Sequence, residues 1–227
     1  IVTCLEFLNK SQGSGRINAV SETLAKSLNS CKNFKISLDS NNYDYIYKIQ
    51  DLINLSGKKY ETKRNFVLQF KKRYKYEYRK LTTDILTQCL DLQEKWCNLK
   101  NCILDESISM ENKCVYELLH NFEILKLFGS TIYIDDKLQA FTIAETLNDN
   151  TTVIHTEKAN TEYRGIYQAI NNMFCEKDLS DFIFVNREQD MGVEGLRKAK
   201  LSYHPHHMVT KYNIELNPPY SPFIKGE

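Results

Sequence analysis

Residues 185–205 (VNREQDMGVEGLRKAKLSYHP) hold charged, amide and hydroxyl side chains that could act together in catalysis or binding. An apolar run at 182–185 ends abruptly in an amide, a guanidinium and two carboxylates: Asn186, Arg187, Glu188 and Asp190. Cations and an aromatic hydroxyl follow at Arg197, Lys200 and Tyr203. Acids, bases and amides directly after a buried strand favour a binding or catalytic site at the strand's C-terminal end. The plainer alternative is a strand, a turn and a solvated basic helix.

The surrounding sequence predicts the elements that position this stretch. Helical periodicity is expected at 1–9, 17–28, 84–100 and 106–125, with a further helix starting near Ser56, and a short strand at 34–38. The period then changes to two, which predicts a hairpin from 131–134 and 138–146 and a strand at 151–157. A helix at 165–174, a strand at 181–185, a helix at 195–201 and a strand at 208–216 complete the chain. This order predicts the α/β class with a mixed sheet.

The most strongly charged segment is 58–80. It contains ten Lys or Arg and two Glu, a net charge of +8 (ten minus two), whereas the whole chain has a net charge of +1. Such a segment could dock a phosphate backbone or an anionic membrane surface. The alternative is an amphipathic helix with a solvated basic face.

Composition narrows the class of protein. We find no apolar run of the ~18 residues that a membrane-spanning helix needs, and no signal peptide. The seven cysteines have no CxxC spacing, so we expect reduced, buried thiols in a cytoplasmic protein. The histidines at His204, His206 and His207 lack a nearby set of acids, and no metal site is expected. Because the chain begins at Ile1, we expect a fragment.

Several stretches together resemble a known family. They are YDYIYKIQDLINLSGKKYETKRN (43–65), AFTIAETL (140–147), HTEKA (155–159) and 185–205. At this ordered spacing they resemble the phosphatidylglycerol lysyltransferase C-terminal-like family over roughly 43–212. The resemblance implies a GNAT-type acyltransferase fold with a mixed central sheet flanked by helices. It also implies that 1–42 is the remnant of an N-terminal GNAT-like domain, that 43–217 is the C-terminal GNAT-like domain, and that 218–227 is an extended tail.

The resemblance implies an acyltransferase that moves an aminoacyl group from a charged tRNA to an amine or hydroxyl acceptor. In this fold the acyl group lies where two strands splay apart, which places Glu157 and Lys158 beside Asn186. We expect Glu188 or Asp190 to bind the α-amine or act as base, and Asn186 and Lys158 to polarise the carbonyl. The remaining expected site residues bind substrate and phosphates: Arg187, Arg197, Lys200 and Tyr203, with Lys58, Lys59, Lys63 and Arg64 as a phosphate or RNA track. Each also has a structural alternative, such as a surface ion pair for Glu157 and Lys158.

Two alternatives to this function remain. An acyl-CoA-dependent N-acetyltransferase would use acetyl-CoA or another acyl-CoA, whereas the aminoacyl reaction needs no cofactor. The matching turn, NTEYRGIYQA (160–169), keeps Gly165 but has Glu162 where a glutamine or arginine is usual, and Glu162 would repel a pyrophosphate. The second alternative is a non-catalytic module that binds tRNA or an anionic lipid headgroup.

Overall fold

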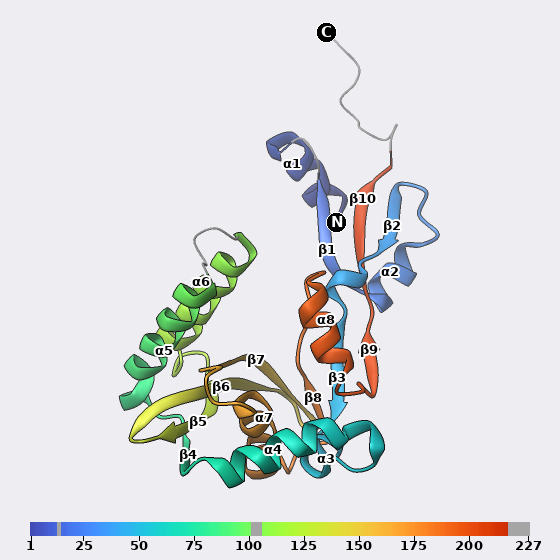
Figure 1. Cartoon of the computed structure of the whole chain (residues 1–227). Helices are drawn as coiled ribbons and strands as arrows, with labels where there is room; N and C mark the ends of the chain where they lie inside the picture. Colours follow the sequence, from blue (N-terminus) through green and yellow to red (C-terminus); the bar gives the residue numbers. More distant parts are fainter. Residues whose placement is uncertain (13–14, 101–105, 218–227) are drawn as a thin grey trace. The chain divides into compact units, whose positions relative to one another are not determined.

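The computed structural model describes residues 1–12, 15–100 and 106–217 (Figure 1). Its described residues pack into two compact units. The first unit comprises 1–45, 188–202 and the segment from 207 onward, and the second comprises 46–187 and 203–206. The chain therefore leaves and re-enters each unit, and we describe the two separately.

The second unit is built on a mixed sheet. Its strands are β4 (Tyr76–Lys80), β5 (Phe128–Ile134), β6 (Lys137–Asn148), β7 (Thr151–Ala159), β8 (Phe184–Asn186) and the part of β3 (Asp44–Lys48) from Ile46 onward. They lie in the order β4-β5-β6-β7-β8-β3. The pair β7–β8 is parallel and the other neighbours are antiparallel. The predicted α/β class with a mixed central sheet is confirmed.

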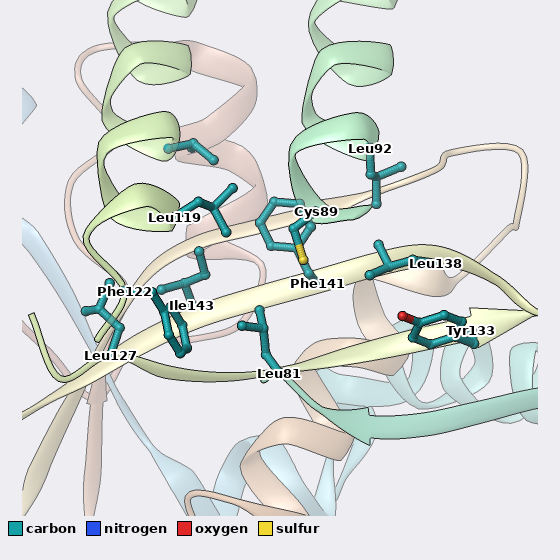
Figure 2. Packing of buried hydrophobic residues seen from close by; sticks show 11 residues of the cluster. Leu81, Cys89, Leu92, Leu119, Phe122, Leu127, Tyr133, Leu138, Phe141 and Ile143 are labelled. Atoms are coloured by element: carbon teal, nitrogen blue, oxygen red, sulfur yellow. The ribbon is translucent and has the colours of Figure 1, made fainter. Parts of the chain in front are cut away.

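Helices flank this sheet on two faces. One group of helices consists of the short α3 (Ile49–Asn54), α4 (Glu61–Arg73) and α7 (Ile166–Lys177), which pack together. A separate pair is formed by α5 (Leu86–Lys100) and α6 (Glu106–His120). Short 3-10 turns precede α4 and α5, namely η2 (Lys58–Tyr60) and η3 (Thr83–Ile85). Side chains alternate along the strands, so Phe141 and Ile143 join the α5–α6 core, which Figure 2 shows, while Ile132 and Ala140 join the α7 core. Each face of the sheet is thus buried by its own apolar cluster.

The hairpin of β5 and β6 follows directly from local sequence. Its two turn residues, Asp135 and Asp136, have φ angles of 51° and 58°. Two consecutive left-handed residues form the turn whose twist matches that of the flanking strands, and Asp tolerates this backbone. The predicted hairpin is confirmed, with β5 and β6 longer than the alternation alone indicated.

The first unit contains a smaller antiparallel sheet in the order β1-β10-β2. Its elements are α1 (Val2–Gln12), β1 (Arg16–Ser21), α2 (Glu22–Leu28), β2 (Phe34–Leu38), η1 (Ser40–Asn42), α8 (Glu194–Leu201), β9 (His207–Val209) and β10 (Lys211–Leu216). The prediction of one helix over 17–28 is wrong in its first half. Ile17 pairs with Ile214 and Val20 with Tyr212, so a partner strand far along the chain overrides the local helical period. The helix begins only after Ser21, whose hydroxyl accepts a hydrogen bond from the Leu24 amide.

This packing bears on the expected domain limits at 42 and 217. Both β1 and β2, from the N-terminal segment, pair with β10 near the C-terminus. The described part of 1–42 therefore packs with a C-terminal strand rather than alone. The predicted domain assignments remain predictions, and the tail at 218–227 lies outside the described residues.

The cysteines differ in their surroundings. Cys89 and Cys175 are buried, and burial raises the pKa of each thiol to about 12. Cys4, Cys31 and Cys114 are free but exposed. The expectation of reduced thiols is wrong for Cys97, which is disulfide-bonded. The spacing of the cysteines gives no signal of this bond. Within the described ranges, no helix combines the length and apolar character needed to cross a bilayer.

Candidate functional site

The parallel pairing of β7 and β8 is short. Its partners are Thr151 with Phe184, Thr152 with Val185, and Val153 with Asn186. The strand β8 ends at Asn186, whereas β7 continues to Ala159. Glu157 therefore lies on a segment of β7 beyond its last registered pair with β8.

A buried ion pair follows at this point. Arg187, the first residue after β8, donates a hydrogen bond to the Glu157 carboxylate, and the two side chains are only 15% and 9% exposed. The second oxygen of Glu157 accepts a hydrogen bond of 2.8 Å from the side-chain amide of Asn171 on α7. Burial alone would lower the pKa of Arg187, but the Glu157 carboxylate together with Tyr47, Tyr203 and Cys175 raises that pKa overall. The guanidinium is thus fixed in its charged form.

Aromatic rings and a lysine complete this group. The Arg187 guanidinium carbon lies 5.0 Å from the ring centroid of Tyr203 and 5.7 Å from that of Tyr47. The Lys63 Nζ lies 4.4 Å from the same Tyr203 centroid. Burial, and then repulsion by Arg187, lowers the pKa of Lys63, while burial is the main cause that raises the pKa of Tyr203. We call Glu157, Arg187, Asn171, Tyr47, Tyr203 and Lys63 the Glu157–Arg187 cluster.

Lys158 lies apart from this cluster although it adjoins Glu157 in sequence. Neighbouring residues of a strand point to opposite faces, and the contacts of Lys158 are on the α5–α6 side. Its Nζ lies 2.7 Å from a carboxylate oxygen of Glu111 and 3.4 Å from the ring centroid of Trp96. The indole N–H of Trp96 donates in turn to the Tyr167 hydroxyl at 3.1 Å. The structure therefore separates the predicted neighbours Glu157 and Lys158.

A pocket of about 710 Å³ lies on the α5 side. Its lining includes the buried Leu92, Leu138 and Ala159, the half-buried Trp96 and exposed charged residues such as Glu162. Neither Glu157 nor Arg187 lines it. The pocket is therefore distinct from the Glu157–Arg187 cluster.

The four residues of the predicted phosphate track differ in their surroundings. Lys58 and Lys59 are exposed on η2. The Arg64 guanidinium donates to the carbonyl oxygens of Leu55 at 2.5 Å and Gly57 at 3.3 Å, and so closes the turn before α4. Of the four predicted residues, Lys63 is the one that contacts the Glu157–Arg187 cluster.

In the first unit, Asp190 is the centre of a hydrogen-bond network. Arg197 contacts both carboxylate oxygens, at 2.8 and 3.0 Å, while the Tyr45 hydroxyl donates at 2.5 Å and the Gly192 amide at 2.8 Å. Although burial by itself raises the pKa of Asp190, these donors lower it below its ordinary value. A carboxylate whose pKa is lowered by these donors is a weak base, and it holds Arg197, Tyr45 and the Gly192 amide in place.

The remaining predicted residues have structural partners. The Lys200 Nζ donates to the backbone carbonyl of Glu188 at 3.1 Å, and Glu188 has a left-handed backbone with φ of 54°. Asn186 is buried on β8, with Ile46 of β3 and Val153 of β7 on its two sides. Thus Glu188, Asp190, Arg197 and Lys200 belong to the first unit, and Asn186 belongs to the second.

The turn at Gly165 bears on the acyl-CoA alternative. Gly165 has φ of 88°, and a Cβ added there would lie 2.7 Å from the carbonyl oxygen of Phe66 on α4. The following amide, that of Ile166, donates to the Tyr163 carbonyl at 3.1 Å. The backbone of α4 therefore packs against the glycine that would have to open toward a pyrophosphate.

Sequence reasoning missed two members of the cluster, Asn171 and Tyr47. Asn171 is 1% exposed within the apolar run of α7, and a buried amide among apolar residues is a detectable signal. Tyr47 is 1% exposed on β3, and its sequence gives no sign that its ring will meet Arg187.

Comparisons with known proteins agree with this fold. A crystal structure of a conserved protein of unknown function from Bacteroides thetaiotaomicron is 36% identical, with a TM-score of 0.86, covering 95% of this chain and 74% of that one. The structure of L-PGS from Bacillus licheniformis is 13% identical, with a TM-score of 0.63, covering 92% of this chain and 70% of that one, and shows likeness of fold. An uncharacterised protein of Mycoplasmoides gallisepticum is 25% identical over 175 residues, which are 76% of this chain and 56% of that protein. The chain thus spans little more than half the length of that curated relative.

The family described as "Phosphatidylglycerol lysyltransferase, C-terminal" matches residues 4–215. This match covers both units and every residue of the Glu157–Arg187 cluster. The family resemblance and the α/β fold with a mixed central sheet flanked by helices, both expected from the sequence, are confirmed. The chain belongs to the phosphatidylglycerol lysyltransferase C-terminal family.

Proposed function

We propose that this protein is an acyltransferase that moves an aminoacyl group from a charged tRNA to an amine or hydroxyl acceptor. The observation that supports it most is the position of the Glu157–Arg187 ion pair, just beyond the last pair of the parallel strands β7 and β8. Family membership supports the reaction class. The acceptor atom attacks the ester carbonyl, the carbon–oxygen bond to the terminal ribose breaks, and the acceptor's proton ends on the ribose oxygen.

The cluster offers suitable groups for such a substrate. Arg187 is a charge fixed by Glu157 and oriented through it by Asn171, so it can hold an anionic oxygen without rearrangement. An aminoacyl ester is already activated, and positioning can supply much of its rate. We assign Asp190 and Arg197 to holding the loop at 188–193 rather than to proton transfer, because Asp190 is saturated with donors and its pKa is lowered.

The partners follow from the charges outside the cluster. Exposed lysines and arginines of α4 and β4, including Lys71, Lys72 and Arg79, suit a nucleic-acid backbone. The same surface suits an anionic lipid headgroup as acceptor. We place the reaction in the cytoplasm, where charged tRNA is formed.

The acyl-CoA alternative is less well supported. A pyrophosphate needs free backbone amides at a glycine-rich helix start. Here Gly165 abuts the Phe66 carbonyl, and Glu162 adds a negative charge to the same turn. Both features oppose a pyrophosphate.

A transfer assay tests the proposal. The protein is incubated with tRNAs charged with labelled amino acids and, in parallel, with labelled acetyl-CoA, each with lipid and amine acceptors. We expect label to move to an acceptor from a charged tRNA, and Glu157→Gln to reduce the rate. Transfer from acetyl-CoA alone would favour the N-acetyltransferase, and tRNA binding without transfer would favour a binding module.

A further inference from the structure

Two polar groups of the Glu157–Arg187 cluster lack partners in the described part of the chain. The Tyr203 side chain is buried, with the whole residue 7% exposed, and its backbone carbonyl accepts from the Tyr60 hydroxyl at 3.0 Å. Its own hydroxyl has no hydrogen-bond partner among the described residues. The fully enclosed polar atoms that lack a partner in the described residues do not include this hydroxyl oxygen, so a small ligand can reach it.

The Lys63 ammonium is the second such group. It is half-buried and lies 4.4 Å from the centroid of the Tyr203 ring. Across the described ranges it has neither an ion pair nor a hydrogen bond, although most lysines that leave solvent gain an acidic partner. Burial, and then repulsion by Arg187, opposes the charge of Lys63, and a bound anion would favour the charged form.

Counting charges gives the class of the ligand. Lys63 and Arg187 carry two positive charges and Glu157 carries one negative charge, so the charged groups of the cluster sum to +1. A monoanion neutralises this excess, whereas a pyrophosphate would overcompensate it. Lys63 Nζ and the Arg187 guanidinium carbon lie 4.4 and 5.0 Å from the centroid of the same Tyr203 ring. Both groups are charged hydrogen-bond donors, which suits an oxygen ligand.

We propose that Lys63, Tyr203 and Arg187 form a binding site for one monoanionic oxygen group, either a phosphodiester or a carboxylate. The Tyr203 hydroxyl and the Lys63 ammonium donate hydrogen bonds to the anion, and Arg187 contributes a fixed charge. That the anion belongs to the aminoacyl donor rests on the proposed function. The site itself does not, because it is defined by these three side chains.

The role of Lys63 differs here from a general basic track. Lys58 and Lys59 are exposed, and Arg64 is bonded to the backbone of 55–57. Lys63 alone among the four contacts Tyr203. We therefore expect the loss of Lys63 to act on a small anion, and not only on a long polyanion.

Binding measurements on the whole chain test this site. The probes are inorganic phosphate, acetate and an uncharged RNA hairpin ending in CCA, titrated by calorimetry into wild type, Lys63→Met, Lys63→Arg, Tyr203→Phe and Lys177→Met. The last is a matched control, because Lys177 lies 4.8 Å from the ring centroid of Tyr78, away from the cluster. Circular dichroism establishes that each variant is folded.

We expect at least one small anion to bind, about tenfold more weakly to Lys63→Met and Tyr203→Phe, with Lys63→Arg and Lys177→Met near wild type. Preference for phosphate and the hairpin would identify a phosphodiester, and preference for acetate a carboxylate. The proposal is overturned if neither small anion binds, or if Lys63→Met and Tyr203→Phe bind like wild type. Normal anion binding with no transfer from any charged tRNA would sink the proposed function and leave the site intact.

Discussion

Glu157 and Arg187, which lie 30 residues apart in the sequence, form a buried ion pair directly beyond the last residues that join β7 to β8. The pair links Glu157, on the part of β7 beyond its pairing with β8, to Arg187, the first residue after β8. Since its Arg187 guanidinium also contacts Tyr203 and Tyr47, changes to the pair should affect both stability and substrate binding.

Replacing Glu157 by glutamine should destabilise the second unit. The change leaves Arg187 charged and buried without its carboxylate, and removing one partner of a buried pair typically costs about 3 kcal/mol. Urea unfolding of Glu157→Gln should show this loss in the free energy of unfolding. Glu22→Gln is the matched control, because Glu22 forms an exposed pair with Lys26, and the loss of an exposed pair should change the free energy of unfolding little. Equal losses in the two variants would contradict a buried role for Glu157.

Asp190 should stabilise the first unit in a pH-dependent way. Its pKa in the folded protein is lowered, so its contribution is complete above the unfolded pKa of about 3.9 and is lost as the pH falls through the folded value. The difference in free energy of unfolding between wild type and Asp190→Asn should therefore be full at neutral pH and shrink below about pH 4. Urea titrations at several pH values measure it. A difference that is constant with pH would rule out the charged network with Arg197.

Lys63 should titrate below the ordinary lysine pKa of 10.5. Burial, and then Arg187, lowers its pKa, so its ammonium loses the proton earlier as the pH rises. Nuclear magnetic resonance of 13C-methylated Lys63 can measure its midpoint. In Arg187→Gln the midpoint of Lys63 should rise but stay below 10.5, since the burial remains. A wild-type midpoint for Lys63 at or above 10.5 would contradict this environment.

Gly165 should not tolerate a side chain. Its left-handed backbone disfavours any Cβ by about 1–2 kcal/mol, and the Phe66 carbonyl 2.7 Å away adds a clash. We expect a lower melting temperature for Gly165→Ala, measured by circular dichroism. Gly195→Ala is the control, because Gly195 is on α8 with no atom within 4 Å of the added Cβ, and alanine favours a helix. A Gly165→Ala variant as stable as wild type would mean that α4 does not pack against this turn.

Local signals made much of the fold predictable. The hairpin of β5 and β6 could be predicted because alternation and a two-residue aspartate turn act within one short stretch. The strand β1 could not, since it is determined by pairing with β10, whose Ile214 and Tyr212 lie almost 200 residues away. The pairing with β10 outweighed the helical preference that the periodicity at 17–28 indicates.

The candidate site was predictable to a smaller extent. The family resemblance directed attention to Glu157 and Arg187, which the structure brings together. The strand's own period could have separated Lys158 from Glu157, because adjacent residues face opposite sides. Asn171 was missed because its role depends on how α7 packs against β7, which one sequence does not reveal.

The most direct test of the proposed aminoacyl transfer is equilibrium binding of charged tRNA, uncharged tRNA and acetyl-CoA to wild type and Arg187→Lys. Lysine keeps the charge but not the planar, forked geometry of arginine. We predict that charged tRNA binds wild type more tightly than uncharged tRNA, that Arg187→Lys loses this difference, and that acetyl-CoA binds neither protein. Tight binding of acetyl-CoA with no preference for charged tRNA would contradict the proposed donor.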